Sequence, residues 1–485
     1  MQAIKHHTRI VGSSLIYNYV LSFSSFVAFL ASSHVNKKAQ PDYRNPLLLS
    51  DAKKKVAEMS GRDVADVRVV ISPYRICPLG AHIDHQGGTV LAMTVNKGII
   101  LAFVPSCDRQ VVLRSGQFAG DVKFRVDEEQ LPRSSMPVKE KNSGWGCYAR
   151  GALYALQKTG HKLNEGIIGF ISGSDGLDSS GLSSSAAVGI AYLVALESAN
   201  NLCVSPSENI ELDKLIENAY LGLRNGILDQ SAILLSKYGY LTLMDCKTKK
   251  HTFVSSSMLN GAKSSERANK YKILLAFSGA KHCLKDNPGY NCRIDDVQVK
   301  TILGLYGSFI MLVKKGFVST LYIDTWIVTV GAESVDPRLC EVGPSIYEAY
   351  KHKLKENLAK RAEHYFSENK RVHEGVKAWA SGNLVEFGKL ISASGLSSIQ
   401  NYECGCEPMI QLYEILLRTP GVFGARFSGA GFRGCCLAFV DANQAEVATA
   451  FIQREYSKTQ PELARQVPGG RVALLCEAGD SARVI

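Results

Sequence analysis

The chain has 485 residues, of which 46% are hydrophobic and 21% charged; this composition excludes a disordered protein and predicts a folded chain of two domains. The formal net charge is +11, but the lysines and arginines are scattered, so we do not expect nucleic-acid binding. The 13 cysteines are irregularly spaced, and neither Cys404-x-Cys406 nor Cys435-Cys436 has the second half of a zinc site. Mostly buried thiols in a reducing compartment fit this pattern best.

The N-terminal stretch is unusually apolar. Residues 10–33 contain no charged side chain and follow Lys5 and Arg9, a pattern that is typical of a signal peptide or a membrane anchor. Polar side chains interrupt the run, and the alternative is an atypical extension, residues 1–46, ahead of a domain that begins near Leu47. We expect a cytoplasmic protein without a membrane partner, and a targeting segment stays open as the alternative.

Apolar periodicity predicts alternating helices and strands in the first half of the chain. The expected helices are residues 51–59, 145–158, 186–195 and 210–222, and the expected strands are residues 67–72, 89–104, 166–172 and 241–244. A polar, Ser/Lys-rich stretch at 247–270 predicts the boundary between an N-terminal domain, 47–260, and a C-terminal domain, 261–485.

The expected loop at 73–88, PYRICPLGAHIDHQGG, concentrates chemically active side chains. Arg75, His82, Asp84 and His85 stand there between glycines and prolines. Charged residues that cluster on a loop between strands favour a functional site, and the alternative is a structural Asp–His pair on a turn.

A second candidate is the stretch 176–187, GLDSSGLSSSAA, which leads into an apolar helix. The N–H groups and dipole of a helix N-terminus suit a phosphate, and serine hydroxyls can add donors or a ligand for Mg²⁺. A Ser-rich turn with an ordinary N-cap is the alternative. Further on, a helix carries Glu217, and the run LRNGILDQ delivers Asp229 to the start of the next helix.

The second half begins with an expected strand at 273–277 and the run NPGYNCR at 287–293. Expected helices at 345–371, 378–394 and 407–418 precede two strands that flank a glycine loop, 427–434, FSGAGFRG. This loop matches G-x-G-x-x-G, but a strand-like run, 435–440, follows it where the dinucleotide fingerprint needs a helix. We therefore exclude a Rossmann fold.

No Walker sequence occurs, and the Gly-rich loop, H-R-D and D-F-G set of protein kinases is also missing. Taken together, the Arg75–Asp84 loop, the serine loop with Glu217 and Asp229, and the glycine loop resemble the GHMP kinase family of small-molecule kinases. The loop at 75–88 resembles the galactokinase sugar signature, G-R-V-N-L-I-G-E-H-x-D-Y-x-G-G. The three motifs stand in the family's order, and the twelve-residue step from Glu217 to Asp229 also matches.

The resemblance implies an α/β (α+β) fold, with a ribosomal-S5-like N-terminal domain and a ferredoxin-like C-terminal domain around a cleft. It implies ATP and Mg²⁺ as cofactors, with Asp229 and Arg75 as catalytic residues. The implied ATP-binding residues are Gly181, Leu182, Ser183, Ser184, Ser185 and Ala186, and the implied metal ligands are Ser185 and Glu217. The implied sugar-binding residues are Ala81, His82, Asp84, Tyr290 and Gly431.

One departure from galactokinases bears on the substrate. Ala81 stands where galactokinases have a glutamate that faces the C6 hydroxyl of the sugar, and loss of that carboxylate would remove repulsion of a C6 carboxylate. PLGAHIDHQGG and FSGAGFRG are similar to the corresponding runs of plant galacturonic acid kinases. We therefore expect a kinase for the anomeric hydroxyl of galacturonic acid, with Arg433, a glycine in most galactokinases, as a further candidate for contact with the uronate.

Two other departures leave alternatives open. Residues 297–335 are apolar and β-rich where the relatives have a helix, which suggests a divergent insert or a gene-model error, and Asp178 to Ser180 replace the glycines usual before the serines. Galactokinase or another sugar-1-kinase, a non-catalytic sugar sensor and a membrane-anchored binding protein are the alternative functions. The expected partners are a sugar acid and ATP, and the oligomeric state stays open.

Overall fold

The computed structural model describes residues 46–135, 144–173, 182, 184–223, 225–257, 270–280 and 338–485. The apolar run at 10–33 and the atypical segment at 297–335 lie outside these residues, as do three predicted site residues, Gly181, Ser183 and Tyr290. Across the ranges just given, no helix is both long and apolar enough to cross a membrane.

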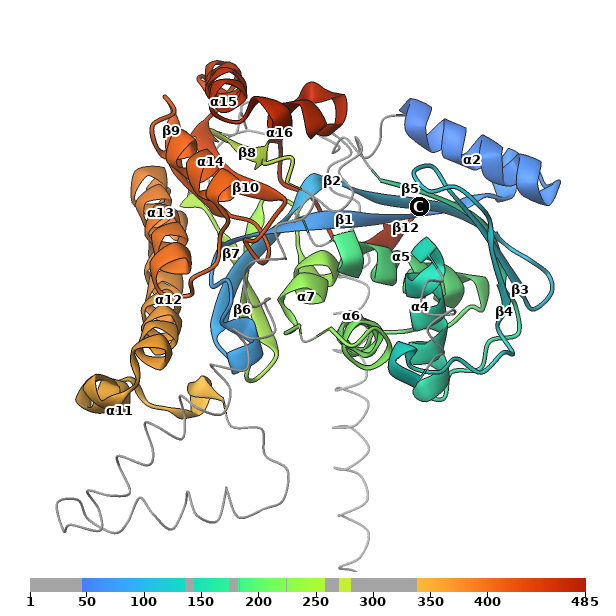
Figure 1. The fold of residues 1–485 in the computed structure, drawn as a ribbon. Helices are drawn as coiled ribbons and strands as arrows, with labels where there is room; N and C mark the ends of the chain where they lie inside the picture. The colour runs from blue at the N-terminus through green and yellow to red at the C-terminus, as the bar shows by residue number, and fades with distance from the viewer. Residues whose placement is uncertain are drawn as a thin grey trace, which may run out of the picture.

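A mostly antiparallel eight-stranded sheet forms the N-terminal half of the fold (Figure 1). Its strands run in the order β12-β1-β2-β5-β3-β4, with β6 paired to β2 and β7 to β6. The strands are β1 (Arg68–Leu79), β2 (Thr89–Pro105), β3 (Gln110–Ser115), β4 (Val122–Arg125), β5 (Ile167–Gly173), β6 (Tyr240–Asp245), β7 (Lys250–Ser255) and β12 (Arg483–Val484). Because β12 pairs with β1, the end of the chain returns to this first sheet.

Strand β1 is longer than the sequence pattern indicates. We expected a loop from Pro73 onward, but the strand continues to Leu79, so Arg75 lies on a strand. The pairing with β2 shifts register between Pro73 and Arg75, and such a bulge accommodates a residue that cannot donate an N–H. The connecting loop is therefore only residues 80–88, and it contains one 3₁₀ turn, Asp84–Gln86.

Helices cover both faces of this sheet. Helix α2 (Pro46–Ser60) packs on β2 and β5, and α5 (Ser184–Ala199) and α7 (Leu228–Leu235) pack on β1 and β2 from the other side (Figure 1). Helix α4 (Cys147–Lys158) packs beside α5, and α6 (Pro206–Lys214) continues into a π-helical turn, Leu215–Tyr220. Helix α5 begins two residues before the expected 186, so Ser184 and Ser185 belong to its first turn.

The C-terminal half is built on a four-stranded antiparallel sheet in the order β11-β8-β10-β9. Its strands are β8 (Tyr271–Phe277), β9 (Val422–Phe427), β10 (Cys435–Asp441) and β11 (Ala473–Cys476). Its helices are α11 (Pro344–Tyr350), α12 (Glu356–Ala380), α13 (Leu384–Gln400), α14 (Glu407–Leu417), α15 (Ala445–Thr459) and α16 (Pro461–Gln466). Helices follow β8 and β10, and this is the β-α-β-β-α-β order of the predicted ferredoxin-like fold.

The predicted helix at 345–371 is wrong as a single element. The chain forms α11 and a short 3₁₀ turn, takes extended backbone angles at Leu354 and Lys355, and only then begins α12. Neither proline nor glycine marks this break, so periodicity alone carried the expected helix across it.

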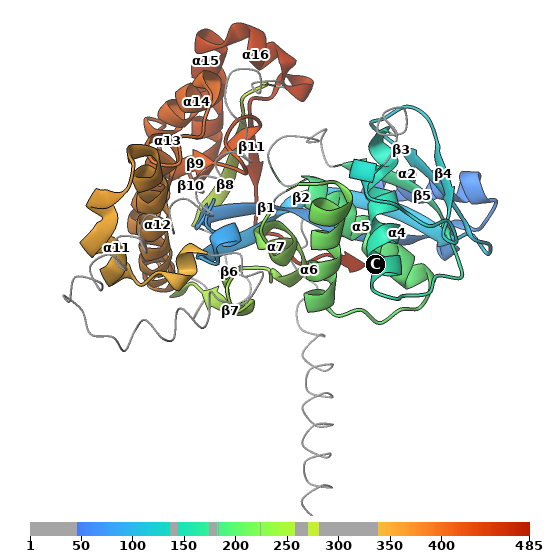
Figure 2. The same ribbon diagram turned by 60° about the horizontal axis from the view of Figure 1, so that its bottom comes forward.

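Strands β1 and β2 reach from the first sheet to helices α12 and α13 (Figure 2). The loop between these strands, residues 80–88, therefore lies against the C-terminal half. One direct link there is the hydrogen bond from the Thr89 N–H to Asn369 Oδ1, at 2.9 Å.

Candidate active site

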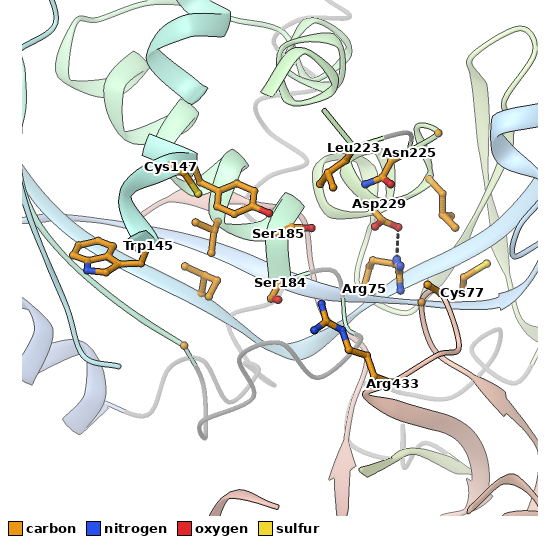
Figure 3. Close-up of a pocket in the computed structure, with 18 of the residues that line it drawn as sticks. Arg75, Cys77, Trp145, Cys147, Ser184, Ser185, Leu223, Asn225, Asp229 and Arg433 are labelled. Carbon is orange, nitrogen blue, oxygen red and sulfur yellow. Dashed lines mark hydrogen bonds and ion pairs between the residues drawn. The ribbon is translucent and has the colours of Figure 1, made fainter. Parts of the chain in front are cut away.

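A cavity of about 640 Å³ lies where the two halves meet. Its walls come from β1 and the 80–88 loop, the start of α5, the start of α7 and the glycine loop between β9 and β10 (Figure 3). Among the lining residues are Arg75, Ala81, His82, Asp84, Ser184, Ser185 and Asp229. Side chains from all three sequence motifs thus meet around one cavity.

Arg75 and Asp229, which both line this cavity, form an ion pair. Arg75 Nε lies 2.7 Å from Asp229 Oδ1, although the two residues are 154 positions apart (Figure 3). Arg75 is buried, and its Nη1 has no hydrogen-bond partner within the described part of the chain. Arg75 therefore brings a fixed positive charge to the wall of the cavity, and one of its donors is unpaired among the described residues.

Ser185 and Glu217 also come together. Glu217 is fully buried in the π-helical turn, where its carboxylate accepts from Asn225 Nδ2 at 3.0 Å and contacts the Ser185 hydroxyl. Burial and the nearby charge of Asp229 raise the pKa of Glu217 to about 7. Its Oε1 has no hydrogen-bond partner among the described residues, so a hydroxyl and an incompletely satisfied carboxylate stand side by side.

Asp213, one helical turn before Glu217, is a buried carboxylate that the sequence reasoning missed. Neither of its oxygens has a hydrogen-bond partner in the described ranges, and Oδ1 occupies the space that a side chain on Gly189 of α5 would need. Burial, followed by the charges of Glu217 and Asp229, raises the pKa of Asp213 well above its ordinary value. In the sequence, the four-residue spacing between Asp213 and Glu217 on an expected helix could have indicated that the two carboxylates lie on one face.

Asp84 connects the 80–88 loop to the turn that carries Asp229. Its Oδ2 accepts from the Leu228 N–H at 3.2 Å, and it packs so closely on Gly226 that a Cβ there would lie 2.0 Å from the same oxygen. Burial would raise the pKa of Asp84, but contacts with His85 and the Leu228 N–H lower it below its ordinary value. Asp84 therefore stays ionised and also orients the start of α7.

Ala81 and His82 line the end of the cavity where the motif predicts the sugar, which we call the sugar end. His82 is 5% exposed and adopts a φ of +67°, which a residue with a side chain rarely takes. Its ring stacks on Tyr402 with centroids 4.3 Å apart, and its Nε2 lies 3.6 Å from Cys404 Sγ. The His82 ring is thus held by the C-terminal half of the chain.

In the glycine loop, Gly429, Ala430, Phe432 and Arg433 line the cavity. Gly431, the predicted sugar-binding glycine, has a φ of +82° and packs against Cys404, where a Cβ would lie 2.9 Å from Sγ. Arg433 extends across the cavity toward Ser184 (Figure 3). The positive φ and the close contact with Cys404 therefore require a glycine at position 431, and Arg433 lies where it can contact a ligand.

Two predicted ATP-binding residues, Leu182 and Ala186, have fully buried side chains in the hydrophobic core. Any contact with a phosphate would therefore involve their backbone atoms. The cavity lining also includes Phe118, Trp145 and Tyr148, which the sequence reasoning did not select. Their signal was aromatic side chains at the start of a helix and in a loop, a pattern that is too common to indicate a site by itself.

Both halves of the chain are similar to known proteins. Residues 148–237 match the GHMP kinases N terminal domain, and residues 374–458 match the GHMP kinases C terminal model. The chain is 60% identical over 446 residues to a galacturonokinase of Arabidopsis thaliana, covering 90% of this chain and 98% of the relative. It is 30% identical over 378 residues to a galactokinase of Clostridium perfringens, covering 77% and 86% of the two chains.

Among solved structures, the Lactococcus lactis galactokinase complexed with galactose superposes with a TM-score of 0.71 at 26% identity. The match covers 89% of this chain and 98% of that chain. The chain therefore belongs to the GHMP kinase family, and the two-domain fold expected from the three motifs is confirmed.

Proposed function

We propose that the protein is an ATP-dependent sugar-1-kinase that phosphorylates the anomeric hydroxyl of D-galacturonic acid, giving galacturonate 1-phosphate for UDP-galacturonate synthesis. The observation that carries the proposal is the Arg75–Asp229 ion pair in a cavity whose sugar end carries Ala81. The 60% identity to a galacturonokinase supports the choice of sugar. The irregular spacing of the 13 cysteines, which fits a reducing compartment, supports a cytoplasmic location.

Asp229 would accept or orient the proton of the anomeric hydroxyl. A carboxylate suits this role when it stays ionised and fixed, and the bond to Arg75 Nε fixes it. The Nη1 of Arg75 would then offset negative charge that develops on the phosphoryl group in the transition state. Phosphoryl transfer needs little else from the protein beyond such positioning and charge stabilisation.

The phosphates of ATP would lie at the N-terminus of α5, where Ser184 and Ser185 face the cavity. Ser185 and Glu217 fit a divalent cation, because a hydroxyl and a carboxylate with an unpartnered oxygen are the hard oxygen ligands that Mg²⁺ takes. Ser185 and Glu217 would hold the ion, and its positive charge would offset the negative charge of the phosphate groups.

The sugar would lie beside the 80–88 loop, in contact with His82 and Asp84. A methyl group at Ala81 leaves room for a C6 carboxylate and does not repel it. Arg433 brings a positive charge to the same cavity and could attract either the uronate or a phosphate. Tyr290, also a proposed sugar contact, lies outside the described residues.

The test is ATP-dependent phosphorylation by the purified full chain, with galacturonate, galactose and glucuronate measured side by side. We expect turnover with galacturonate and its loss in Asp229→Ala. Preferred turnover of galactose would instead identify a galactokinase. ATP binding without turnover of any sugar would indicate a sugar sensor, the alternative from a different class.

A further inference from the structure

Helix α12 holds the backbone of the 80–88 loop, which we call the sugar loop, through two side chains. Glu368 Oε1 accepts from the Gly80 N–H at 2.7 Å, and His364 Nε2 lies 3.1 Å from the carbonyl oxygen of Ala81. His364 and Glu368 are four residues apart, so they stand on one face of the helix. They fix the peptide group between Leu79 and Gly80 and the one between Ala81 and His82, on either side of the Gly80–Ala81 peptide.

Both side chains are fully buried and are fixed in turn. Glu368 pairs with Arg371 at 2.7 Å and with Arg426 at 3.4 Å, and it accepts from Ser394 Oγ at 2.5 Å. His364 Nδ1 lies 3.0 Å from Ser397 Oγ. With Nε2 donating to Ala81, Nδ1 is left to accept from the serine hydroxyl. We call Glu368, His364, Arg426, Ser394 and Ser397 the anchor cluster.

The anchor cluster also reaches the other wall of the sugar end. Arg426 is the next-to-last residue of β9, and its Nε donates to the carbonyl oxygen of Phe427, where the glycine loop begins. Its Nη1 donates to Ser394 Oγ at 2.6 Å. One buried set of charges therefore fixes both the 80–88 loop and the start of the 427–434 loop.

The strained conformation of His82 indicates why this support matters. A non-glycine residue with a φ of +67° costs free energy and persists only where its surroundings determine it fully. The carbonyl before His82 is the Ala81 oxygen bound by His364, and the ring stacks on Tyr402. Without the bond from His364, the peptide between Ala81 and His82 can rotate toward an ordinary conformation.

We infer that His364 and Glu368 are positioning residues for sugar selectivity, which act from outside the cavity by fixing Ala81 and His82 on one wall and the glycine loop on the other. The inference rests on the proposed function, since it assigns a role to the sugar end of that site. Neither His364 nor Glu368 lines the cavity, so any effect on sugar use must pass through the groups they hold. These groups are the loop backbone and the His82 ring, whose centroid lies 5.9 Å from that of the His364 ring.

The experiment measures KM for galacturonate, KM for ATP and the galacturonate-to-galactose ratio of kcat/KM in three variants of the full chain. His364→Ala removes the donor, His364→Gln keeps an amide N–H that can reach the Ala81 carbonyl, and His373→Gln changes an exposed histidine of the same helix. Because small misplacements of a bound substrate are costly, we expect His364→Ala to raise KM for galacturonate about ten-fold or more. KM for ATP should stay near the wild-type value.

The selectivity ratio should fall in His364→Ala, recover in part in His364→Gln and stay unchanged in His373→Gln. Equal changes in KM for sugar and ATP, or no change in either, would overturn the inference. Should His364→Ala not fold, Ser397→Ala removes the bond that orients His364, together with a bond from Asn401 Nδ2, and leaves the imidazole in place. An unchanged KM for sugar in that variant would also overturn the inference. If the wild type uses another sugar, the proposed function fails, and the same KM comparison with that sugar still decides the inference.

Discussion

The molecule has two largely buried groups of charged side chains near the sugar loop: the proposed catalytic end, with Arg75, Glu217 and Asp229, and the anchor cluster. They differ in how completely their polar atoms are paired. At the catalytic end, Arg75 Nη1 and Glu217 Oε1 have no hydrogen-bond partner among the described residues. In the anchor cluster, the buried side-chain atoms of His364 and Glu368 are all paired within those same residues. A buried polar group without a hydrogen-bond partner costs free energy unless a ligand supplies the partner. The pairing therefore suits the first cluster to ligand binding and the anchor cluster to fixing the backbone of the loop.

The pKa values of the two acidic residues show the same contrast. Burial raises the pKa of Glu217 to about 7, with Asp229 adding to the effect. Burial also acts to raise the pKa of Glu368, but Arg371 and Arg426 outweigh it and lower the pKa to about 2. The anchor carboxylate has its compensating cations in the fold. For Glu217, the proposed metal ligand, the contribution of Arg75 does not outweigh burial and Asp229, and the proposed Mg²⁺ would supply further positive charge.

The largest expected effect is on catalysis. Asp229→Asn keeps the shape of the side chain but removes the proton acceptor, so kcat should fall by about 10³-fold. Steady-state assays measure the loss, and circular dichroism checks that the fold is retained. A variant that is folded and still within about ten-fold of the wild-type kcat would show that Asp229 is not the proton acceptor.

The next effect is on stability. Glu368→Ala leaves Arg426 buried without its carboxylate, so the free energy of unfolding should fall by about 3–4 kcal/mol. Denaturant unfolding measures it. Glu356→Ala, at an exposed pair with Lys360 on the same helix, is the matched control and should cost less than about 1 kcal/mol. Equal losses in both variants would contradict the contrast between the two clusters.

A pH effect of intermediate size follows from His364. Burial lowers the pKa of His364 from 6.5 to about 4, although Glu368 and the Ala81 carbonyl act to raise it, so the unfolded chain binds the proton first. The stability that neutral His364 contributes is present above pH 6.5 and is lost as the pH falls toward 4. Between pH 7 and pH 5 the wild type should lose about 2 kcal/mol more than His364→Gln. Parallel pH profiles of the two proteins would refute this.

The smallest expected effect comes from Asp213, and its dependence on pH is opposite in sign to that of His364. The raised pKa means that its contribution to stability is lost as the pH rises above the ordinary value of 3.8. Asp213→Asn should therefore raise the free energy of unfolding by about 1 kcal/mol at pH 8 in the absence of Mg²⁺. Thermal unfolding measures it, with the wild type under the same conditions. Destabilisation by this change would mean that the carboxylate has a structural partner.

The sequence analysis selected the residues of the proposed catalytic end but not those of the anchor cluster, and the reason is physical. Arg75, Ser185, Glu217 and Asp229 stand in compact motifs, where turns and helix starts place chemically active groups at fixed spacings. His364 and Glu368 stand in an amphipathic helix whose pattern only indicates a packed face. Gly80 is brought to them by the packing of the two halves, and Arg426 by the packing of β9 within the C-terminal half. Local sequence patterns encode neither contact.

Two errors in the predicted elements have a similar origin. Pro73 indicated a loop, but a register shift in the pairing with β2 lets the strand continue to Leu79. The helix expected at 345–371 is interrupted at Leu354 and Lys355 without a proline or glycine. In both cases tertiary pairing or packing decided the backbone against a local signal.

The most direct test of the account is the galacturonate-to-galactose ratio of kcat/KM in the wild type and in Ala81→Glu. The added carboxylate would face the uronate, so the ratio should favour galacturonate in the wild type and fall by about ten-fold or more in the variant. KM for ATP should be the same in both proteins. An unchanged ratio in a folded Ala81→Glu variant would contradict the claim that the sugar loop selects the substrate through the residue at this position.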